Sequence, residues 1–174
     1  MMKRFVQLLA AGFAFTGTAC VSVLPEAAPA KPRYHIAAAD IQTLQGAPLD
    51  FSLVVDEPRA TRVYDSVRMA VSAAPGRIEY LGGGEWADRA PRLFQTALIQ
   101  TFEDTGRILG VGDRYAIPVS DFVLQTDLRR MELDVSGDDA VVVSIFARMT
   151  DGKGGVFGVR KFDARVPVSS QQPA

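Results

Sequence analysis

The single cysteine of this 174-residue chain, Cys20, limits how the chain can fold. Without a second cysteine no disulfide can form within the chain, so a hydrophobic core must hold the fold alone. Cys20 follows a short positive segment with Lys3 and Arg4, an uncharged apolar stretch over residues 5–17, and two small residues. This order of features is typical of a secretory signal peptide. We therefore predict that residues 1–19 are an export signal.

The residues that end this signal resemble the lipobox of bacterial lipoproteins, in which small residues precede a cysteine that receives a lipid. The segment reads Gly17-Thr18-Ala19-Cys20, and Gly17 stands where the pattern usually has leucine or another aliphatic residue. The alternative is ordinary cleavage after Ala19, which would leave a free thiol in an oxidising compartment, where cysteines normally pair. We therefore expect Cys20 to be lipidated. Since no aspartate follows it, the resemblance favours an outer-membrane location facing the periplasm.

The charge balance argues against several classes of partner. Removing the signal takes Lys3 and Arg4 from the 19 basic residues, so 17 remain against 20 acidic residues. A slightly acidic domain has neither the basic surface of a nucleic-acid-binding protein nor a polybasic membrane patch. No stretch of the chain has the roughly 20 apolar residues of a membrane-spanning helix. We therefore expect contact with the membrane through the lipid on Cys20, and no nucleic-acid partner.

Proline and alanine dominate the segment that follows the cysteine. Pro25, Pro29 and Pro32 lie among alanines, and each proline disfavours helical geometry at the residue before it. We predict that residues 20–33 form an extended tether. Residues 34–168 are then expected to form one domain with a core of its own, and residues 169–174 a polar tail.

The clearest local pattern is a helix over about residues 88–105. Its apolar residues recur at three- and four-residue spacing and predict one buried stripe, formed by Ala90, Leu93, Phe94, Ala97, Leu98, Thr101 and Phe102. Asp88 is the expected N-cap, Pro91 suits the first turn, and Gly106 suits the end of the helix. The solvent side would carry Gln95, Gln100, Glu103 and Asp104. Ile99 and Leu109 lie off the stripe.

Runs of apolar and alternating residues predict strands on both sides of this helix. Before the helix we expect strands at residues 34–36, 50–55 and, as a hairpin, 66–72 with 77–81. After it we expect strands at residues 122–135, 140–150 and 156–166, joined by hairpin turns. The apolar phase of the first of these shifts after Leu128, which indicates a bulge near Arg129 and Arg130. The order predicts an α+β fold: a mainly antiparallel sheet with one long amphipathic helix packed on it, as a two-layer sandwich.

The sequence offers little for catalysis or cofactor binding. His35 is the only histidine, so neither a zinc site nor a cysteine–histidine pair can be assembled in the domain. Gly82-Gly83-Gly84 lacks the spacing of a phosphate-binding loop and is expected to interrupt the regular structure as a flexible connection. Asp138 and Asp139 are expected in a turn rather than at a metal. We predict no enzymatic activity, no cofactor and no metal.

The ordered set of strands and helix resembles the ABC-type transport auxiliary lipoproteins, relatives of paraquat-inducible protein C. The resemblance runs from Cys20 to about Val168. Its most specific stretch joins Ile78-Glu79-Tyr80, Glu85-Trp86-Ala87 and the helix through Phe94. Members of that family usually continue past the last strand into a second helix that packs on the sheet, whereas this sequence stops at Ala174. We therefore expect an edge or a face of the sheet to be uncovered.

This resemblance implies a function in lipid transport in Gram-negative bacteria. It implies a lipid-anchored accessory component of an MCE-type (mammalian cell entry) ABC transport system that moves lipids between membranes. The partner would be the MCE-domain protein of that system, with phospholipid as one candidate ligand. Contacts are expected on the exposed sheet edge and near Tyr80 and Trp86, although both aromatic residues also suit a purely structural role in the core. The alternative function is a structural or stress-related envelope lipoprotein without a transport role.

Overall fold

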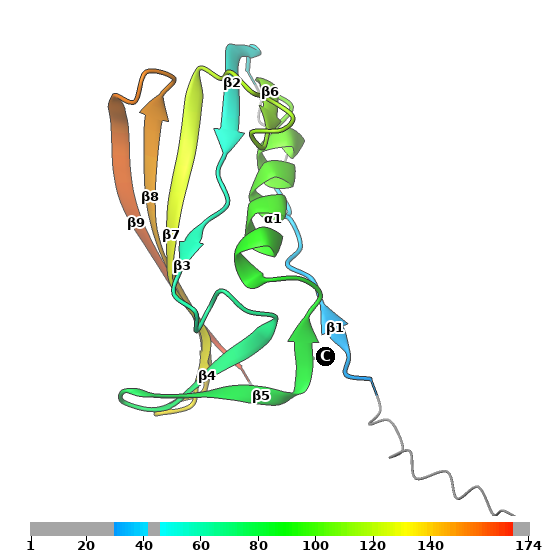
Figure 1. The fold of residues 1–174 in the computed structure, drawn as a ribbon, viewed down its shortest axis with the longest axis vertical. Coiled ribbons are helices and arrows are strands. Elements are labelled where there is room, and N and C mark those ends of the chain that lie inside the picture. The colour runs from blue at the N-terminus through cyan, green and yellow to red at the C-terminus, as the bar shows by residue number, and fades with distance from the viewer. Residues whose placement is uncertain (1–29, 42–45, 169–174) are drawn as a thin grey trace, which may run out of the picture. The chain divides into compact units, whose positions relative to one another are not determined.

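The computed structural model describes residues 30–41 and 46–168, so the predicted signal, Cys20 and the polar tail lie outside the described residues. Within these ranges nine strands form one sheet, and one helix, α1 (Ala90–Asp104), packs on it (Figure 1). The strands are β1 (Arg33–Tyr34), β2 (Leu49–Val55), β3 (Arg59–Ala60), β4 (Arg68–Ala74), β5 (Arg77–Trp86), β6 (Ile108–Gly112), β7 (Phe122–Asp134), β8 (Ala140–Asp151) and β9 (Val156–Pro167).

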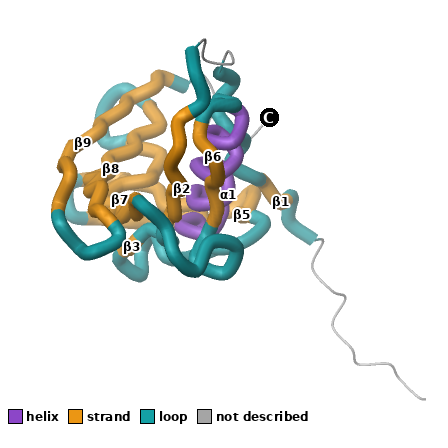
Figure 2. The backbone as a smooth tube through the Cα atoms, turned by 90° about the horizontal axis from the view of Figure 1, so that it is seen from above, coloured by secondary structure: helices purple, strands orange, loops and turns teal. Residues whose placement is uncertain are grey.

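The long strand β7 organises the sheet. On one side it pairs antiparallel with β8 along its whole length. On its other side the first half of β7 pairs parallel with β2 and β3, and its last residues pair parallel with β4. The sheet therefore branches at β7, because β6 joins β2 on one branch while β5 and then β1 join β4 on the other. In the described part of the chain β9 pairs with β8 alone and forms the outer edge (Figure 2).

The α+β class is confirmed, and the longest pairings, β7–β8 and β8–β9, are antiparallel as predicted. The sheet is mixed, however, because β1, β2, β3 and β4 all take part in parallel pairings. Strands β3 and β6 are not predicted from the sequence, because they are short and lack an alternating pattern. The predicted two-layer sandwich is not confirmed: α1 lies against β2 and β6, while every residue of β9 is exposed.

The core lies between α1 and the strands β2 and β7. Leu53, Val55 and Leu124 form its buried centre, and Leu98 and Ile99 of α1 pack against them. In the sequence pattern Ile99 lies off the apolar stripe, yet it packs against this core. The expectation that Gln95 lies on the solvent side is wrong, because its Nε2 donates to the backbone oxygen of Val55 at 2.8 Å. The buried side of α1 is therefore wider than the predicted stripe.

The two ends of α1 are fixed by different interactions. The expected N-cap Asp88 is wrong: Arg89 occupies the N-cap position and makes no side-chain capping hydrogen bond. The Arg89 guanidinium instead forms ion pairs with Glu57 and Asp65, which hold the start of the helix to the segment between β2 and β4. At the other end the predicted stop is confirmed. Gly106 follows the helix with φ of 65°, a conformation that glycine adopts without steric cost.

The predicted bulge in β7 is confirmed. Leu128 opposes Ile145 and Arg130 opposes Ser144, so Arg129 is an extra residue on β7. One extra residue reverses which side chains of a strand point to a given face. The apolar residues of β7 therefore lie on one face on both sides of the bulge: Leu124, Leu128, Met131 and Leu133.

The predicted hairpin is confirmed as β4 and β5, but its second strand is longer than expected. Gly82-Gly83-Gly84 does not interrupt the strand, because β5 continues through these glycines to Trp86. Arg68 opposes Glu85 and Ala70 opposes Tyr80, so β5 holds three more residues than β4 between these pairs. An odd number of extra residues reverses the alternation of side chains. As a result Tyr80 and Trp86 lie on opposite faces of the sheet.

Charged residues occupy the face of β7 opposite Met131 and Leu133. The Glu132 side chain is only 3% exposed and accepts hydrogen bonds from the Tyr64 hydroxyl and the Arg130 guanidinium. Burial, followed by the hydrogen bond to Glu132, raises the pKa of Tyr64 well above its ordinary value. Asp134 accepts hydrogen bonds from Ser136 and then Arg165, and these two groups hold the pKa of Asp134 well below its usual range.

We expect the ionised Asp134 carboxylate to stabilise the fold at neutral pH. Its folded-state pKa lies below the value of about 4 for an unfolded aspartate, so this stabilisation is present above about pH 4 and is lost as the pH falls through the folded-state pKa. Asp134→Asn should therefore lower the melting temperature at pH 7 and flatten its decline in acid. Thermal melts between about pH 7 and pH 2 measure this, with the exposed Asp104→Asn as control. Melting curves of Asp134→Asn that track the wild type at every pH would contradict it.

Candidate apolar binding site

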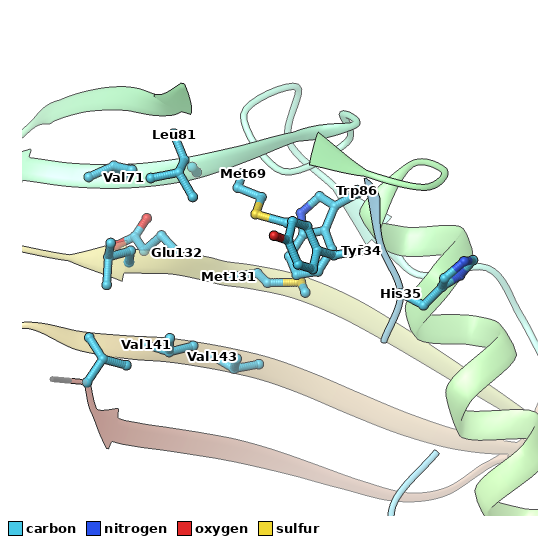
Figure 3. A pocket seen from close by; sticks show the side chains of 13 residues that line it. Tyr34, His35, Met69, Val71, Leu81, Trp86, Met131, Glu132, Val141 and Val143 are labelled. Atoms are coloured by element: carbon cyan, nitrogen blue, oxygen red, sulfur yellow. The ribbon is translucent and has the colours of Figure 1, made fainter. Parts of the chain in front are cut away.

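Trp86 lines an apolar cavity of about 350 Å³ that is bordered by β1, β4, β5, β7 and β8 (Figure 3). Tyr34 of β1 pairs with Trp86 of β5, so two aromatic rings from neighbouring strands stand at one end of the cavity. The rest of the lining is mostly aliphatic and thioether side chains, with one acidic residue, Glu132: the apolar residues are Met69, Ala70, Val71, Leu81, Met131, Leu133, Val141, Val143 and Val168. We name this cavity the Trp86 pocket.

The chemistry of the Trp86 pocket suits an apolar group. Its volume lies within the range of roughly 300–1,000 Å³ that is usual for small-molecule sites. Met69 and Met131 converge with Tyr34 and Trp86 in Figure 3, and methionine side chains adapt readily to the shape of a bound group. His35 also borders the cavity, but its ring points away from this cluster. The arrangement can desolvate an apolar side chain or hydrocarbon chain.

The two residues predicted to contact a partner do not share this site. Tyr80 is absent from the lining of the Trp86 pocket, and the Arg68 guanidinium lies 3.7 Å from the centroid of its ring on the other face of the sheet. Arg68 and Met69 are consecutive residues of β4 and therefore point to opposite faces. Tyr80 thus takes part in a cation–π contact, whereas Trp86 lines a cavity.

A second apolar depression opens between α1 and the outer strands, with a volume of about 620 Å³. We name it the β8–β9 groove. Helix α1 contributes Phe94, Leu98 and Phe102, β8 contributes Ile145, Ala147 and Met149, and β9 contributes Phe157, Val159 and Phe162. The groove could not be predicted from the sequence, because α1 is far along the chain from the β8–β9 hairpin that it faces. The only local signal was the set of apolar residues on β9.

The pocket and the groove lie on the same face of the sheet. Alternate residues of β8 connect them, because Val141 and Val143 line the Trp86 pocket and Ile145, Ala147 and Met149 line the groove. Thr126, 5% exposed, also lines the groove, and its hydroxyl makes no hydrogen bond to the described residues. Continuous exposed apolar surfaces of this kind mark binding sites for ligands or partner proteins.

The remaining sequence predictions concern metals, turns and the membrane. Asp138 and Asp139 lie in the connection between β7 and β8. Across residues 30–41 and 46–168, no group of three or more His, Cys, Asp or Glu side chains is placed to hold a metal ion. A search of the same residues finds no helix with both the length and the hydrophobicity to span a membrane. Cys20, the predicted lipidation site, lies outside the described residues.

This chain is similar to proteins of known structure and to a protein known from its sequence. A crystal structure of a Xanthomonas campestris protein of the DUF330 family superposes with a TM-score of 0.66 at 27% identity, over 82% of this chain and 80% of that one. A crystal structure of an uncharacterized protein superposes with a TM-score of 0.63 at 13% identity, over 81% and 82%, and shows likeness of fold alone. An uncharacterized protein of Bradyrhizobium diazoefficiens is 29% identical over 129 residues, or 72% of this chain. The match covers only 34% of that relative's length.

A family model also matches this chain over most of its length. Residues 34–174 match the model described as the ABC-type transport auxiliary lipoprotein component. The match begins in β1 and therefore includes both the Trp86 pocket and the β8–β9 groove.

Proposed function

Because the chain belongs to the family of ABC-type transport auxiliary lipoprotein components, we propose that it is the accessory component of an MCE-type ABC transport system. In this proposal Cys20 carries the lipid, the domain faces the periplasm from the outer membrane, and the system moves lipids between membranes. The observation that carries the proposal is the family match over residues 34–174. The chain has no enzymatic activity of its own in this role.

The Trp86 pocket supports a role in binding the MCE-domain protein of the same system. Protein interfaces draw most of their binding energy from a few aromatic and other large side chains in desolvated pockets. Tyr34 and Trp86 present two such rings beside the flexible side chains of Met69 and Met131. We propose that an apolar side chain of the MCE-domain protein enters this pocket, so the contact lies at the β1–β5 side of the sheet.

Replacing Trp86 with alanine is expected to weaken capture of the MCE-domain protein at least tenfold, since truncating a central aromatic residue costs on the order of 2 kcal/mol of binding energy. The measurement is quantitative pull-down with the tagged full chain from detergent-solubilised membranes. Tyr115→Ala is the matched control, because Tyr115 is exposed in the connection between β6 and β7. Tyr80→Ala reports whether the contact also reaches the opposite face.

Thermal melts of each variant establish first that the protein is folded. If folded wild-type protein captures no MCE-domain protein, the transport proposal is wrong and the structural envelope lipoprotein becomes the better explanation. If Trp86→Ala captures as much as wild type, the complex stands but the Trp86 pocket is not its contact site. Trp86 would then serve to pack β5 against β1.

A further inference from the structure

Strand β9 forms an edge of the sheet in the described part of the chain. All twelve of its residues are exposed, and in the described part of the chain it pairs with β8 alone. Its side chains include the exposed Phe157, Phe162 and Val166. Natural proteins usually cover or shorten such edges, because the free amide and carbonyl groups of an apolar edge strand pair readily with another strand. A second strand that pairs with β9 would therefore need side chains, and charges in particular, that are complementary to those of β9.

The charges of β9 are complementary to those of a second β9 in one register. In a symmetric antiparallel pair, one residue lies on the two-fold axis opposite its own copy. With Phe162 on the axis, Lys161 of each copy lies opposite Asp163 of the other, and Arg160 lies opposite Ala164. Moving the axis by one residue would place Lys161 or Asp163 against its own copy, which is unfavourable because like charges repel.

A register centred on Ala164 is the other one that joins opposite charges, since it places Asp163 opposite Arg165. Arg165 is already engaged within its own chain, where it donates to the Asp134 carboxylate at 2.9 Å and to the backbone oxygen of Asp138 at 2.7 Å. The Lys161 ammonium, in contrast, forms its ion pair within β9, with Asp163 at 3.0 Å, and not with another strand. The register centred on Phe162 is therefore favoured.

We propose that two copies of this chain associate edge to edge through β9, antiparallel, with the two-fold axis at Phe162. The two sheets then form one continuous sheet, and Lys161 and Asp163 exchange their partner within the strand for one across the axis. Arg160 and Phe162 line the β8–β9 groove, with the Arg160 guanidinium 5.1 Å from the centroid of the Phe162 ring. In the dimer the same two residues of the second copy border this groove, so the apolar surface continues across the axis.

A charge-swap experiment tests this register. The full chain is purified in detergent, and its dimer fraction is measured against concentration by native mass spectrometry. Lys161→Asp is expected to raise the dimer dissociation constant at least tenfold, because it places two like-charged pairs across the axis. Lys161→Asp with Asp163→Lys should restore dimerisation to near the wild-type level. Lys153→Asp, with the same charge change in the turn before β9, should have no effect.

Three results would overturn the proposal: a wild-type chain that stays monomeric, a Lys161→Asp chain that dimerises like wild type, or a folded double variant that stays monomeric. Thermal melts separate these outcomes from unfolding. If Lys161→Asp dimerises like the wild type and Arg165→Asp no longer dimerises, the register is centred on Ala164 instead. Dimerisation is measured without any other protein, and the proposed MCE contact lies at the Trp86 pocket. Failure of one proposal is therefore distinguishable from failure of the other.

Discussion

Replacing Cys20 with alanine is expected to abolish fatty-acid labelling of the protein and to release it from the outer membrane. Burial of acyl chains contributes about 0.8 kcal/mol per methylene, so several chains on one cysteine hold a protein to a bilayer far more strongly than one. The proposed function depends on this anchor, because the chain has one cysteine and no other residue is expected to carry the lipid. The measurements are metabolic labelling with a fatty-acid analogue and separation of inner and outer membranes.

Ser22→Ala is the matched control for the anchor, since it changes a small residue two positions after the cysteine. It should label and fractionate like the wild type. A wild-type protein that incorporates no label and stays in the soluble periplasmic fraction would show that cleavage occurs after Ala19 without lipidation. In that case Cys20 would be the N-terminal residue of a secreted protein.

The second large effect is expected in the core. Leu53→Ala should destabilise the fold by about 2–5 kcal/mol, because it leaves a cavity where a side chain 1% exposed packs against Val55 and Leu124. For a domain of this size, that loss lowers the melting temperature by on the order of 10 °C. Leu109→Ala makes the same chemical change at a position 71% exposed, so it should alter stability by less than about 0.5 kcal/mol.

Chemical denaturation of both variants measures the difference in the free energy of unfolding. Similar values for Leu53→Ala and Leu109→Ala would show that β2 does not contribute to the core between α1 and β7. The comparison is informative because β2 holds its position through parallel pairing with β6 and β7, a part of the fold that the sequence analysis did not predict.

Local patterns account for the parts of the fold that sequence reasoning found. Helix α1 repeats its apolar stripe over several turns, and β7, β8 and β9 are long strands of twelve or more residues that are separated by clear turn sequences. The shift of phase after Leu128 revealed the bulge at Arg129 because both flanking segments alternate clearly. The strands β3 and β6, which pair in parallel with β7 and β2, could not be predicted because neither has a clear local pattern. β3 has two residues, and β6 (Ile108–Gly112) contains two glycines in five positions.

The site was harder to predict than the fold. Trp86, the only tryptophan, is the most distinctive single residue of the sequence, and it lines a cavity. Tyr80 lies in the same stretch of sequence, which suggests a shared site, but it lies on the opposite face of the sheet. Their separation follows from the three extra residues in β5, which can be counted only against the paired strand β4. The contact of Gln95 with Val55 likewise depends on how α1 is placed over β2.

The central position of β7 also determines the order in which this protein can fold. The β4–β5 hairpin can form as soon as it is synthesised, but the parallel pairings of β2, β3 and β4 with β7 must wait until β7 emerges much later from the ribosome. β7, β8 and β9 are joined by short turns and form rapidly once they are complete, because local pairings close small loops. Until β6 is synthesised the apolar strand β2 has no partner strand, and until β7 follows it has a partner on one side only. A chaperone that shields this early segment would therefore matter more for this protein than one that acts on its C-terminal strands.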